Sequence, residues 1–227
     1  MGPADFEIYR KEVAARMRKT GVTIPEVRRA FRIKYSFSAL PFTEQLPIWT
    51  YIWKEEKNYK VRCQAFFYCE VHALKEPHRK IAWTVLRQWQ NYVDGWPFCD
   101  GLAKIYTQLL VTYPEEVFGQ LAKWNISKDH WKRRQSVVSL LYYSRTKKIY
   151  LPFEQMIPLL DNLMEDEQYY VQKGVGWSLR ELHNVYPEKT FSFLRSNIKR
   201  VSAIAFSPAT EKFDIKKKQL ILSLRRA

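Results

Sequence analysis

The segment around Asp100 holds a carboxylate and an indole ring at a spacing that suits chemistry on a positively charged group. Trp96 and Asp100 lie four residues apart, so on a helix their side chains share one face. Pro97 is suited to the first helical position, which predicts Trp96 at the cap and Asp100 within about the first turn. There the positive end of the helix dipole favours the ionised carboxylate. The ordinary alternative is that Asp100 is a helix cap or a solvated charge.

Three segments share a second pattern, in which a basic residue follows an aromatic residue by three positions. The pairs are Tyr59 and Arg62, Trp131 and Arg134, and Tyr170 and Lys173. Arg134 and Lys173 lie 39 residues apart, and helix pairs that recur at about 40 residues are typical of HEAT-type repeats. Such pairs stack because none can bury its apolar face alone. A basic residue at this position often ties neighbouring repeats together, and we expect that structural role for Arg62.

The elements that carry these residues are predicted to be helices throughout. Thr23 and Glu26 have the spacing of a capping box, with proline in the first turn. Two-residue alternation typical of strands is absent. The sequence therefore predicts an all-α, HEAT-like helical-repeat solenoid of about eleven or twelve helices, forming one domain over residues 1–227 with a concave inner groove. The predicted helices cover 27–35, a segment capped by Thr43, 59–74, a segment opened by Pro77, 97–113, 115–124, 128–144, 152–164, 167–186, 188–196 and 211–226.

The charge of the chain favours a polyanionic partner. Lys and Arg total 38 against 23 acidic residues, giving a formal net charge of +15. Nucleic acid is the first candidate, an acidic membrane surface the second, and solvated charge without a partner the third. The longest uncharged stretches, such as Gln135–Ser144, are too short to span a membrane, and the N-terminus has no apolar signal core. We expect a cytoplasmic protein that does not insert into membranes.

The cysteines and histidines do not predict a metal or cofactor site. Cys63, Cys69 and Cys99 are odd in number and form no C-x-x-C pair, which argues against disulfides, zinc and iron–sulfur clusters. His72 and His78 are poorly spaced for a metal, with a proline between them. Only 7 glycines occur in the chain, which argues against a phosphate-cradling loop. The sequence therefore predicts no metal and no cofactor.

Four segments in order resemble the DNA alkylation repair family of HEAT-like DNA glycosylases, the AlkD type. They are Gly21-Val-x-Ile-Pro-Glu-x-Arg-Arg29, Trp96-x-x-x-Asp100, Trp131-x-x-Arg134 and Gln172-Lys173-x-x-Gly176-Trp177-x-Leu179-Arg180-Glu181. The resemblance covers roughly residues 21–181 and implies an enzyme that hydrolyses the N-glycosidic bond of N3- and N7-alkylated purines in double-stranded DNA. It also implies that the enzyme grips the backbone around the lesion while the base stays stacked, without base flipping.

Carried onto this chain, the resemblance makes Asp100 the catalytic carboxylate and Trp96 and Trp177 aromatic walls against the deoxyribose. Arg134 would hold a phosphate near the lesion. The alkylated purine is cationic and leaves without a general acid, while positive charge grows on the sugar, where a fixed carboxylate stabilises it; Asp100 could also orient the water. The cluster has no obvious Schiff-base lysine, so we expect a monofunctional glycosylase. Pro97 departs from the family's more polar residue, and an aromatic residue of its first helices is replaced near Met17.

The predicted DNA contacts are basic residues of the concave groove, which is therefore expected to be a concave basic DNA-binding groove. The protein is expected to clamp the duplex as a monomer. Two other functions stay open: a non-catalytic HEAT-repeat module that binds damaged or branched DNA, and a protein-binding scaffold. The predicted phosphate contacts are Arg133, Arg134, Lys173, Arg16, Arg18 and Lys19, with Lys216–Lys218 as a further candidate.

Overall fold

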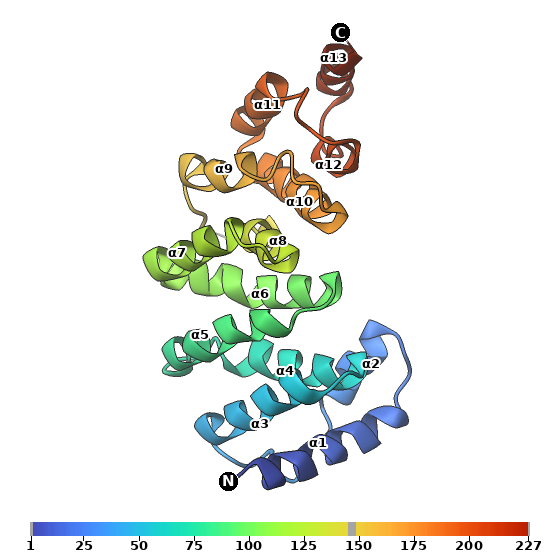
Figure 1. The fold of residues 1–227 in the computed structure, drawn as a ribbon, viewed down its shortest axis with the longest axis vertical. Coiled ribbons are helices and arrows are strands. Elements are labelled where there is room, and N and C mark those ends of the chain that lie inside the picture. The colour runs from blue at the N-terminus through green and yellow to red at the C-terminus, as the bar shows by residue number, and fades with distance from the viewer. Residues whose placement is uncertain (1, 145–148, 227) are drawn as a thin grey trace. The chain divides into compact units, whose positions relative to one another are not determined.

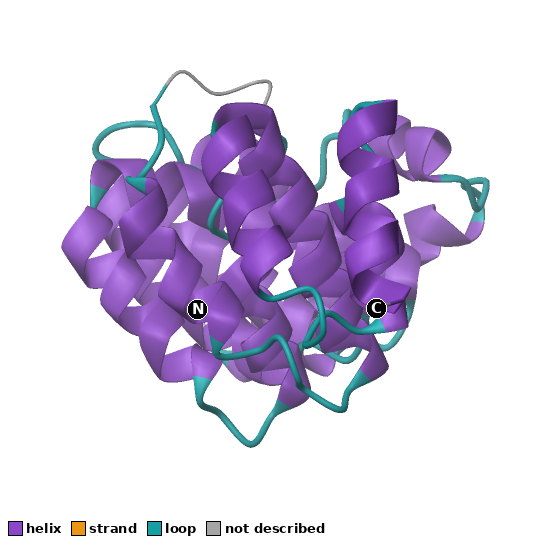
Figure 2. Cartoon of the chain, turned by 90° about the horizontal axis from the view of Figure 1, so that it is seen from above, coloured by secondary structure: helices purple, strands orange, loops and turns teal. Residues whose placement is uncertain are grey.

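The computed structural model describes residues 2–144 and 149–226, and this part of the chain contains helices and connecting segments but no strand (Figure 2). Thirteen α-helices and one short 3-10 helix are described, so the all-α prediction is confirmed. The chain forms two compact units, the first running to Val93 and the second starting at Asp94. Each unit is described by itself below, while a single domain and a concave basic groove stay predictions.

The first unit is built around an aromatic core. Trp53 and Trp89 stack with ring centroids 4.9 Å apart, and the Trp53 indole N–H donates to the main-chain oxygen of Trp89 at 3.0 Å. The buried Arg62 donates to the main-chain oxygen of Tyr92 at 2.5 Å, which confirms its structural role. The helices of this unit are α1 (Pro3–Arg18), α2 (Ile24–Ala30), α3 (Phe42–Glu55), α4 (Tyr59–His72) and α5 (His78–Trp89), followed by the 3-10 helix Gln90–Tyr92 (Figure 1).

The second unit is a succession of packed helices, α6 to α13 (Figure 1). Helix α8 packs against α6, α7 and α10, and α10 packs against α12. Buried polar side chains join the layers: the Asn125 amide donates to the main-chain oxygen of Leu159 at 2.9 Å, and the Thr107 hydroxyl donates to that of Ser139 at 2.7 Å. The helices are α6 (Trp96–Thr112), α7 (Pro114–Asn125), α8 (His130–Val138), α9 (Phe153–Asp161), α10 (Tyr169–Val185), α11 (Pro187–Ser196), α12 (Ala203–Ala209) and α13 (Ile215–Arg226).

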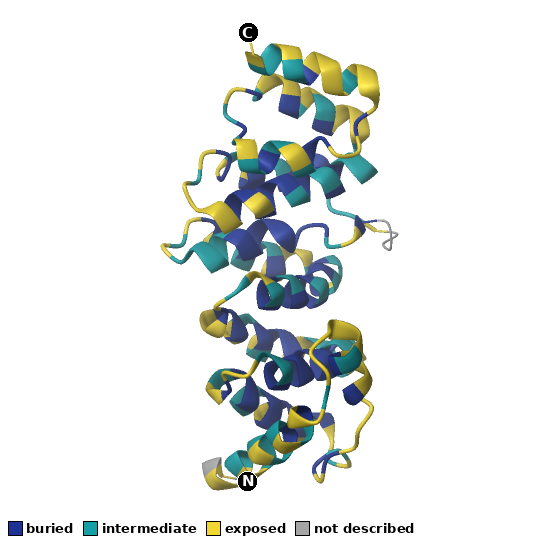
Figure 3. Cartoon of the chain, turned by 90° about the vertical axis from the view of Figure 1, so that its right-hand side faces the viewer, coloured by how far each residue is buried: buried dark blue, intermediate teal, exposed yellow. Residues whose placement is uncertain are grey.

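Helix α10 presents one face to the core and another to solvent. Figure 3 shows that buried and exposed positions are mixed in this way along the helices of each unit. Val175 and Leu179 are buried, while Lys173 is exposed. Gly176 allows α10 to approach α12 closely, because a Cβ there would lie 2.4 Å from the main-chain oxygen of Ala205. The glycine therefore fixes the contact between these two helices.

The observed helix ends differ from the predicted ones at the segment that carries Asp100. The Thr23–Glu26 capping box is present, but α6 begins at Trp96 after an extended Gly95. Pro97 is thus the second helical residue, and Asp100 lies beyond the first turn. The sequence analysis did not single out α1 or α12. Among the described residues, every helix is too short or too polar to cross a bilayer.

Candidate functional site

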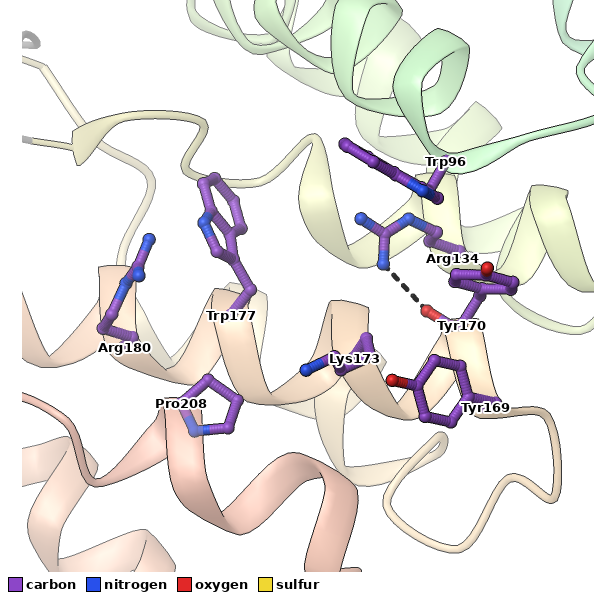
Figure 4. Close-up of a pocket in the computed structure, with 8 residues that line it drawn as sticks. All are labelled: Trp96, Arg134, Tyr169, Tyr170, Lys173, Trp177, Arg180 and Pro208. Carbon is purple, nitrogen blue, oxygen red and sulfur yellow. Dashed lines mark hydrogen bonds between the residues drawn. The ribbon is translucent and has the colours of Figure 1, made fainter.

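A pocket of about 490 Å³ in the second unit is lined by three of the four predicted catalytic residues. Trp96 from α6, Arg134 from α8 and Trp177 from α10 all line it (Figure 4). Asp100, the fourth predicted residue, reaches the site through its bond to Arg134. Residues that lie far apart in the sequence thus converge because α6, α8 and α10 stack in succession. The complete lining is Trp96, Arg134, Tyr169, Tyr170, Lys173, Trp177, Arg180 and Pro208.

The Arg134 guanidinium is held at two points. Its Nη2 donates to Asp100 Oδ1 at 2.6 Å, and its Nη1 donates to the main-chain oxygen of Tyr170 at 2.8 Å (Figure 4). The Arg134 side chain is 7% exposed and that of Asp100 is 28% exposed. Gly174 leaves room for this arrangement, since a Cβ there would lie 3.2 Å from Arg134 Cγ. Arg134 therefore joins α6 and α10 and fixes the carboxylate, and its contact with a DNA phosphate stays a prediction.

The acidity of Asp100 is set by burial and by Arg134. Burial raises the pKa of Asp100 above that of an ordinary aspartate, and the charge and hydrogen bond of Arg134 offset only part of the rise. We had expected the helix dipole to favour ionisation, but Asp100 lies beyond the first turn, where the dipole is weaker. The neighbouring Cys99 is buried and burial raises the pKa of its thiol, which argues against a thiolate nucleophile beside the carboxylate.

Two indole rings flank the pocket at different degrees of exposure. Trp96 is 50% exposed although it begins a helix, while Trp177 is partly buried against Tyr142, with ring centroids 5.3 Å apart. The Arg180 guanidinium carbon lies 5.6 Å from the Trp177 ring centroid. Both rings border the pocket into which Arg134 also projects (Figure 4). The site therefore combines a fixed carboxylate, cationic groups and aromatic faces.

Besides Pro208, three lining residues were not predicted as site residues from the sequence. Tyr169 and Tyr170 expose their rings at the start of α10, and Tyr170 packs against Trp131 with centroids 5.1 Å apart. Arg180 is the third. A signal was present, because Tyr170, Lys173, Trp177 and Arg180 are spaced three and four residues apart and so share one helix face. Their placement alternates aromatic rings and cations along α10.

The predicted phosphate contacts of the second unit lie in different surroundings. Lys173 is exposed and lines the pocket. Arg133 instead donates to Asp166 at 2.5 Å and to the main-chain oxygens of Ser127 and Lys128, so its donors are largely taken up. Lys216 and Lys218 are exposed on α13, while Lys217 pairs with Glu188 at 2.5 Å. Lys173 is thus the best placed of these cations for a ligand in the pocket.

The remaining predicted contacts lie at the end of α1 in the first unit. Arg18 and Lys19 are exposed, whereas Arg16 pairs with Glu12 at 3.2 Å and donates to the main-chain oxygen of Lys34. Met17, where the sequence departs from the family pattern, is buried in the core. Within the described residues, no group of three metal-binding side chains is close enough to hold a metal ion.

Comparison with known proteins decides the family. A sequence model described as DNA alkylation repair enzyme matches residues 3–213. The chain belongs to this family. The resemblance inferred from the four sequence segments is therefore confirmed, and DNA repair is the role that the family's description gives to its members.

Two solved structures share the fold of this DNA alkylation repair family chain. AlkD2 from Streptococcus mutans is 16% identical with a TM-score of 0.60, and the alignment covers 97% of each chain. The smu.31 protein from Streptococcus mutans UA159 is 16% identical with a TM-score of 0.58, covering 96% of this chain and 97% of that one. These likenesses confirm the AlkD-type helical-repeat fold. No curated protein matches the chain.

Proposed function

We propose that the protein is a monofunctional DNA glycosylase that hydrolyses the N-glycosidic bond of N3- and N7-alkylated purines in double-stranded DNA. The observation that carries the proposal is the Arg134–Asp100 ion pair, with 2.6 Å between Nη2 and Oδ1, at a pocket bordered by Trp96 and Trp177. Arg134 holds a carboxylate of limited exposure in one orientation. Such a fixed negative charge is suited to stabilise a cation that exists only in the transition state.

The chemistry follows from the charge of the substrate. Alkylation at N3 or N7 makes the purine cationic, so the electron pair of the breaking C1′–N bond neutralises the base and no general acid is needed. The positive charge moves to the deoxyribose, as in glycoside hydrolysis. Water adds to C1′ and loses its proton to Asp100 or to solvent, which leaves an abasic site and a free neutral purine.

The carboxylate and the indole rings would each stabilise the transition state by an amount typical of such groups. Electrostatic stabilisation by one preorganised group is typically worth about 3–4 kcal/mol, or 10²–10³ in rate, and a desolvated cation–π contact adds about 1–2 kcal/mol. Trp96 and Trp177 would supply such contacts to the sugar cation and exclude water from Asp100. Lys173 would hold a backbone phosphate beside them. Binding through the backbone suits a mechanism that leaves the base stacked in the duplex.

The test is release of 7-methylguanine from duplex DNA, measured as free base and as abasic sites. We expect release by the wild type and a fall of about 10²–10³-fold for Asp100→Asn, which keeps an oxygen acceptor for Arg134. The matched control is Asp161→Asn, because Asp161 also pairs with an arginine at 2.6 Å, but that arginine, Arg200, does not line the pocket as Arg134 does. Equal release by wild type and Asp100→Asn would contradict the proposal.

One observation favours a second function, a non-catalytic module that binds damaged or branched DNA. Arg62 makes the same kind of tie to a main-chain oxygen, that of Tyr92, as Arg134 makes to Tyr170. The Arg134–Asp100 pair would then serve only to join repeats. Tight binding to duplex DNA without base release by the wild type would establish this second function.

A further inference from the structure

The segment that follows α8 holds Tyr143 in a left-handed backbone conformation, with φ at 49°. Bulky L-residues avoid this region because Cβ approaches the backbone carbonyl oxygen too closely. Tyr143 is the only non-glycine residue with positive φ in the described part of the chain. A turn that merely connects two elements would be built more easily with glycine or asparagine at this position.

Hydrogen bonds on both sides of Tyr143 maintain this conformation. The Tyr142 N–H donates to Thr107 Oγ1 at 3.2 Å. On the other side, the Ser144 N–H and hydroxyl donate to Glu181 Oε2 at 2.9 and 2.7 Å, and both Ser144 and Glu181 are buried. An unfavourable backbone conformation persists only where its surroundings fix it in this way.

The strained conformation presents a ring to solvent next to the pocket. Tyr143 is 54% exposed, and its ring meets that of Trp177 edge-on, with centroids 6.3 Å apart and planes at 84°. Glu181, which anchors the turn, lies one helical turn after Trp177 on α10. The helix that carries one wall of the pocket therefore also holds the turn that carries Tyr143.

We propose that Tyr143 is a DNA-contacting residue that extends the Trp177 wall and stacks against a deoxyribose beside the lesion, and that Glu181 is its positioning residue. This inference rests on the proposed function, because it takes the pocket as the place where the damaged nucleotide sits. Every nucleotide carries the same sugar, so this contact does not require an unstacked base. Tyr143 would therefore add affinity for the distorted site without reading sequence.

The experiment compares two substitutions at Tyr143. Tyr143→Asn removes the ring but keeps a residue that tolerates the left-handed conformation, and Tyr143→Phe keeps the ring. Binding is measured by fluorescence anisotropy to a duplex that carries a tetrahydrofuran abasic-site analogue and to the undamaged duplex. We expect Tyr143→Asn to bind the analogue duplex about tenfold more weakly, as for loss of one stacked ring. Tyr143→Phe should bind as the wild type does, and melting temperatures should not fall.

A control and a second variant make the test specific. Ile126→Asn removes another highly exposed apolar side chain, at the end of α7, and should bind as the wild type does. Glu181→Gln should weaken binding of the analogue duplex in the wild-type background but add nothing to Tyr143→Asn. If Glu181 served only the stability of the fold, Glu181→Gln would weaken binding of the analogue duplex by the same factor in the wild type and in Tyr143→Asn.

The outcomes separate this inference from the proposed function. If Tyr143→Asn binds the analogue duplex as tightly as the wild type, or if Tyr143→Phe loses as much affinity as Tyr143→Asn, stacking by Tyr143 is overturned, whatever the base-release assay gives. If the wild type releases no base but Tyr143→Asn alone loses affinity for the analogue duplex, the glycosylase proposal fails and the role of Tyr143 in DNA contact stands.

Discussion

The guanidinium of Arg134 and the carboxylate of Asp100 are joined at 2.6 Å, although their helices are separated in the chain by the whole of α7. Arg134 is itself held by the main-chain oxygen of Tyr170 at 2.8 Å. The position and the acidity of the carboxylate therefore depend on the stacking of α6, α8 and α10.

Removal of Arg134 is expected to shift the pH dependence of base release. In Arg134→Met, the two influences that lower the Asp100 pKa are lost and burial alone acts, so the pKa rises further. Because catalysis needs the carboxylate, the acid limb of the pH–rate profile should move to higher pH. Loss of a buried partner should also cost about 2–4 kcal/mol of unfolding free energy. An unshifted acid limb in a folded Arg134→Met protein would contradict this role of Arg134.

The raised pKa of Asp100 also determines how the free energy of unfolding changes with pH. Asp100 binds its proton more tightly in the folded state than in the unfolded state. The free energy of unfolding therefore falls as the pH rises from the pKa of the unfolded state to that of the folded state. Above the folded-state pKa, the contribution of Asp100 is constant. Urea denaturation across this range should show this loss in the wild type. Asp100→Asn, which does not titrate, should lack that component.

Close packing between α10 and α12 is expected to make Gly176 intolerant of a side chain. In Gly176→Ala, the new Cβ would lie 2.4 Å from the Ala205 oxygen, a main-chain atom, so the helices must separate. Overpacking costs about 1–3 kcal/mol, and a main-chain contact this close lies at the upper end, so after the ~1 kcal/mol gained in helix propensity we expect a net loss of about 1–2 kcal/mol. Gly119→Ala on α7 is the matched control, because nothing lies within 4 Å of its Cβ, and urea denaturation should show it to be stabilising.

The salt dependence of DNA binding should distinguish exposed cations from paired ones. Lys173→Ala should reduce the slope of log affinity against log salt by about 0.9, the value for one phosphate contact. Arg133→Ala should leave the slope nearly unchanged and lower the melting temperature, because Arg133 is bonded to Asp166 and two main-chain oxygens. Equal changes of slope in the two variants would restore Arg133 as a phosphate contact.

Substitution of Arg62 tests whether its hydrogen bond to a main-chain oxygen serves stability alone. Arg62 is buried, donates to the Tyr92 main-chain oxygen and lies over the Trp53 ring at 4.6 Å. Arg62→Met should lower the unfolding free energy by about 1–3 kcal/mol. Its rate of base release per folded molecule should equal that of the wild type, in contrast to Arg134→Met. A specific loss of activity in Arg62→Met would show that the two ties are not separable in function.

The sequence predicted the helical class and half of the residues that line the pocket, because these depend on local signals. Proline and capping residues define helix starts, and Trp96, Arg134 and Trp177 belong to segments that recur or resemble a family. Helix α1 was not singled out, since only Val13 and Met17 are buried along it among the residues whose burial is described. Helix α12 is seven residues long and contains Pro208, which departs from an ordinary helical pattern.

Features that depend on packing between helices could not be predicted. The raised pKa of Asp100 results from its burial in the folded chain, which its own segment does not reveal. The pairing of Arg133 with Asp166 joins residues 33 positions apart, so the charge of Arg133 alone suggested a phosphate contact. The left-handed Tyr143 has no sequence signal, because the bonds that hold it come from Thr107 and Glu181.

The half-exposed indole of Trp96 gives the protein a built-in optical reporter. All eight tryptophans lie in the described residues, and Trp96 alone among them is exposed, while Trp49, Trp53, Trp83, Trp89 and Trp124 are buried. A collisional quencher such as iodide should therefore act mainly on the emission of Trp96. Occupation of the pocket would shield that ring, so a quenching titration can follow ligand binding in unlabelled protein and in catalytically inactive variants alike.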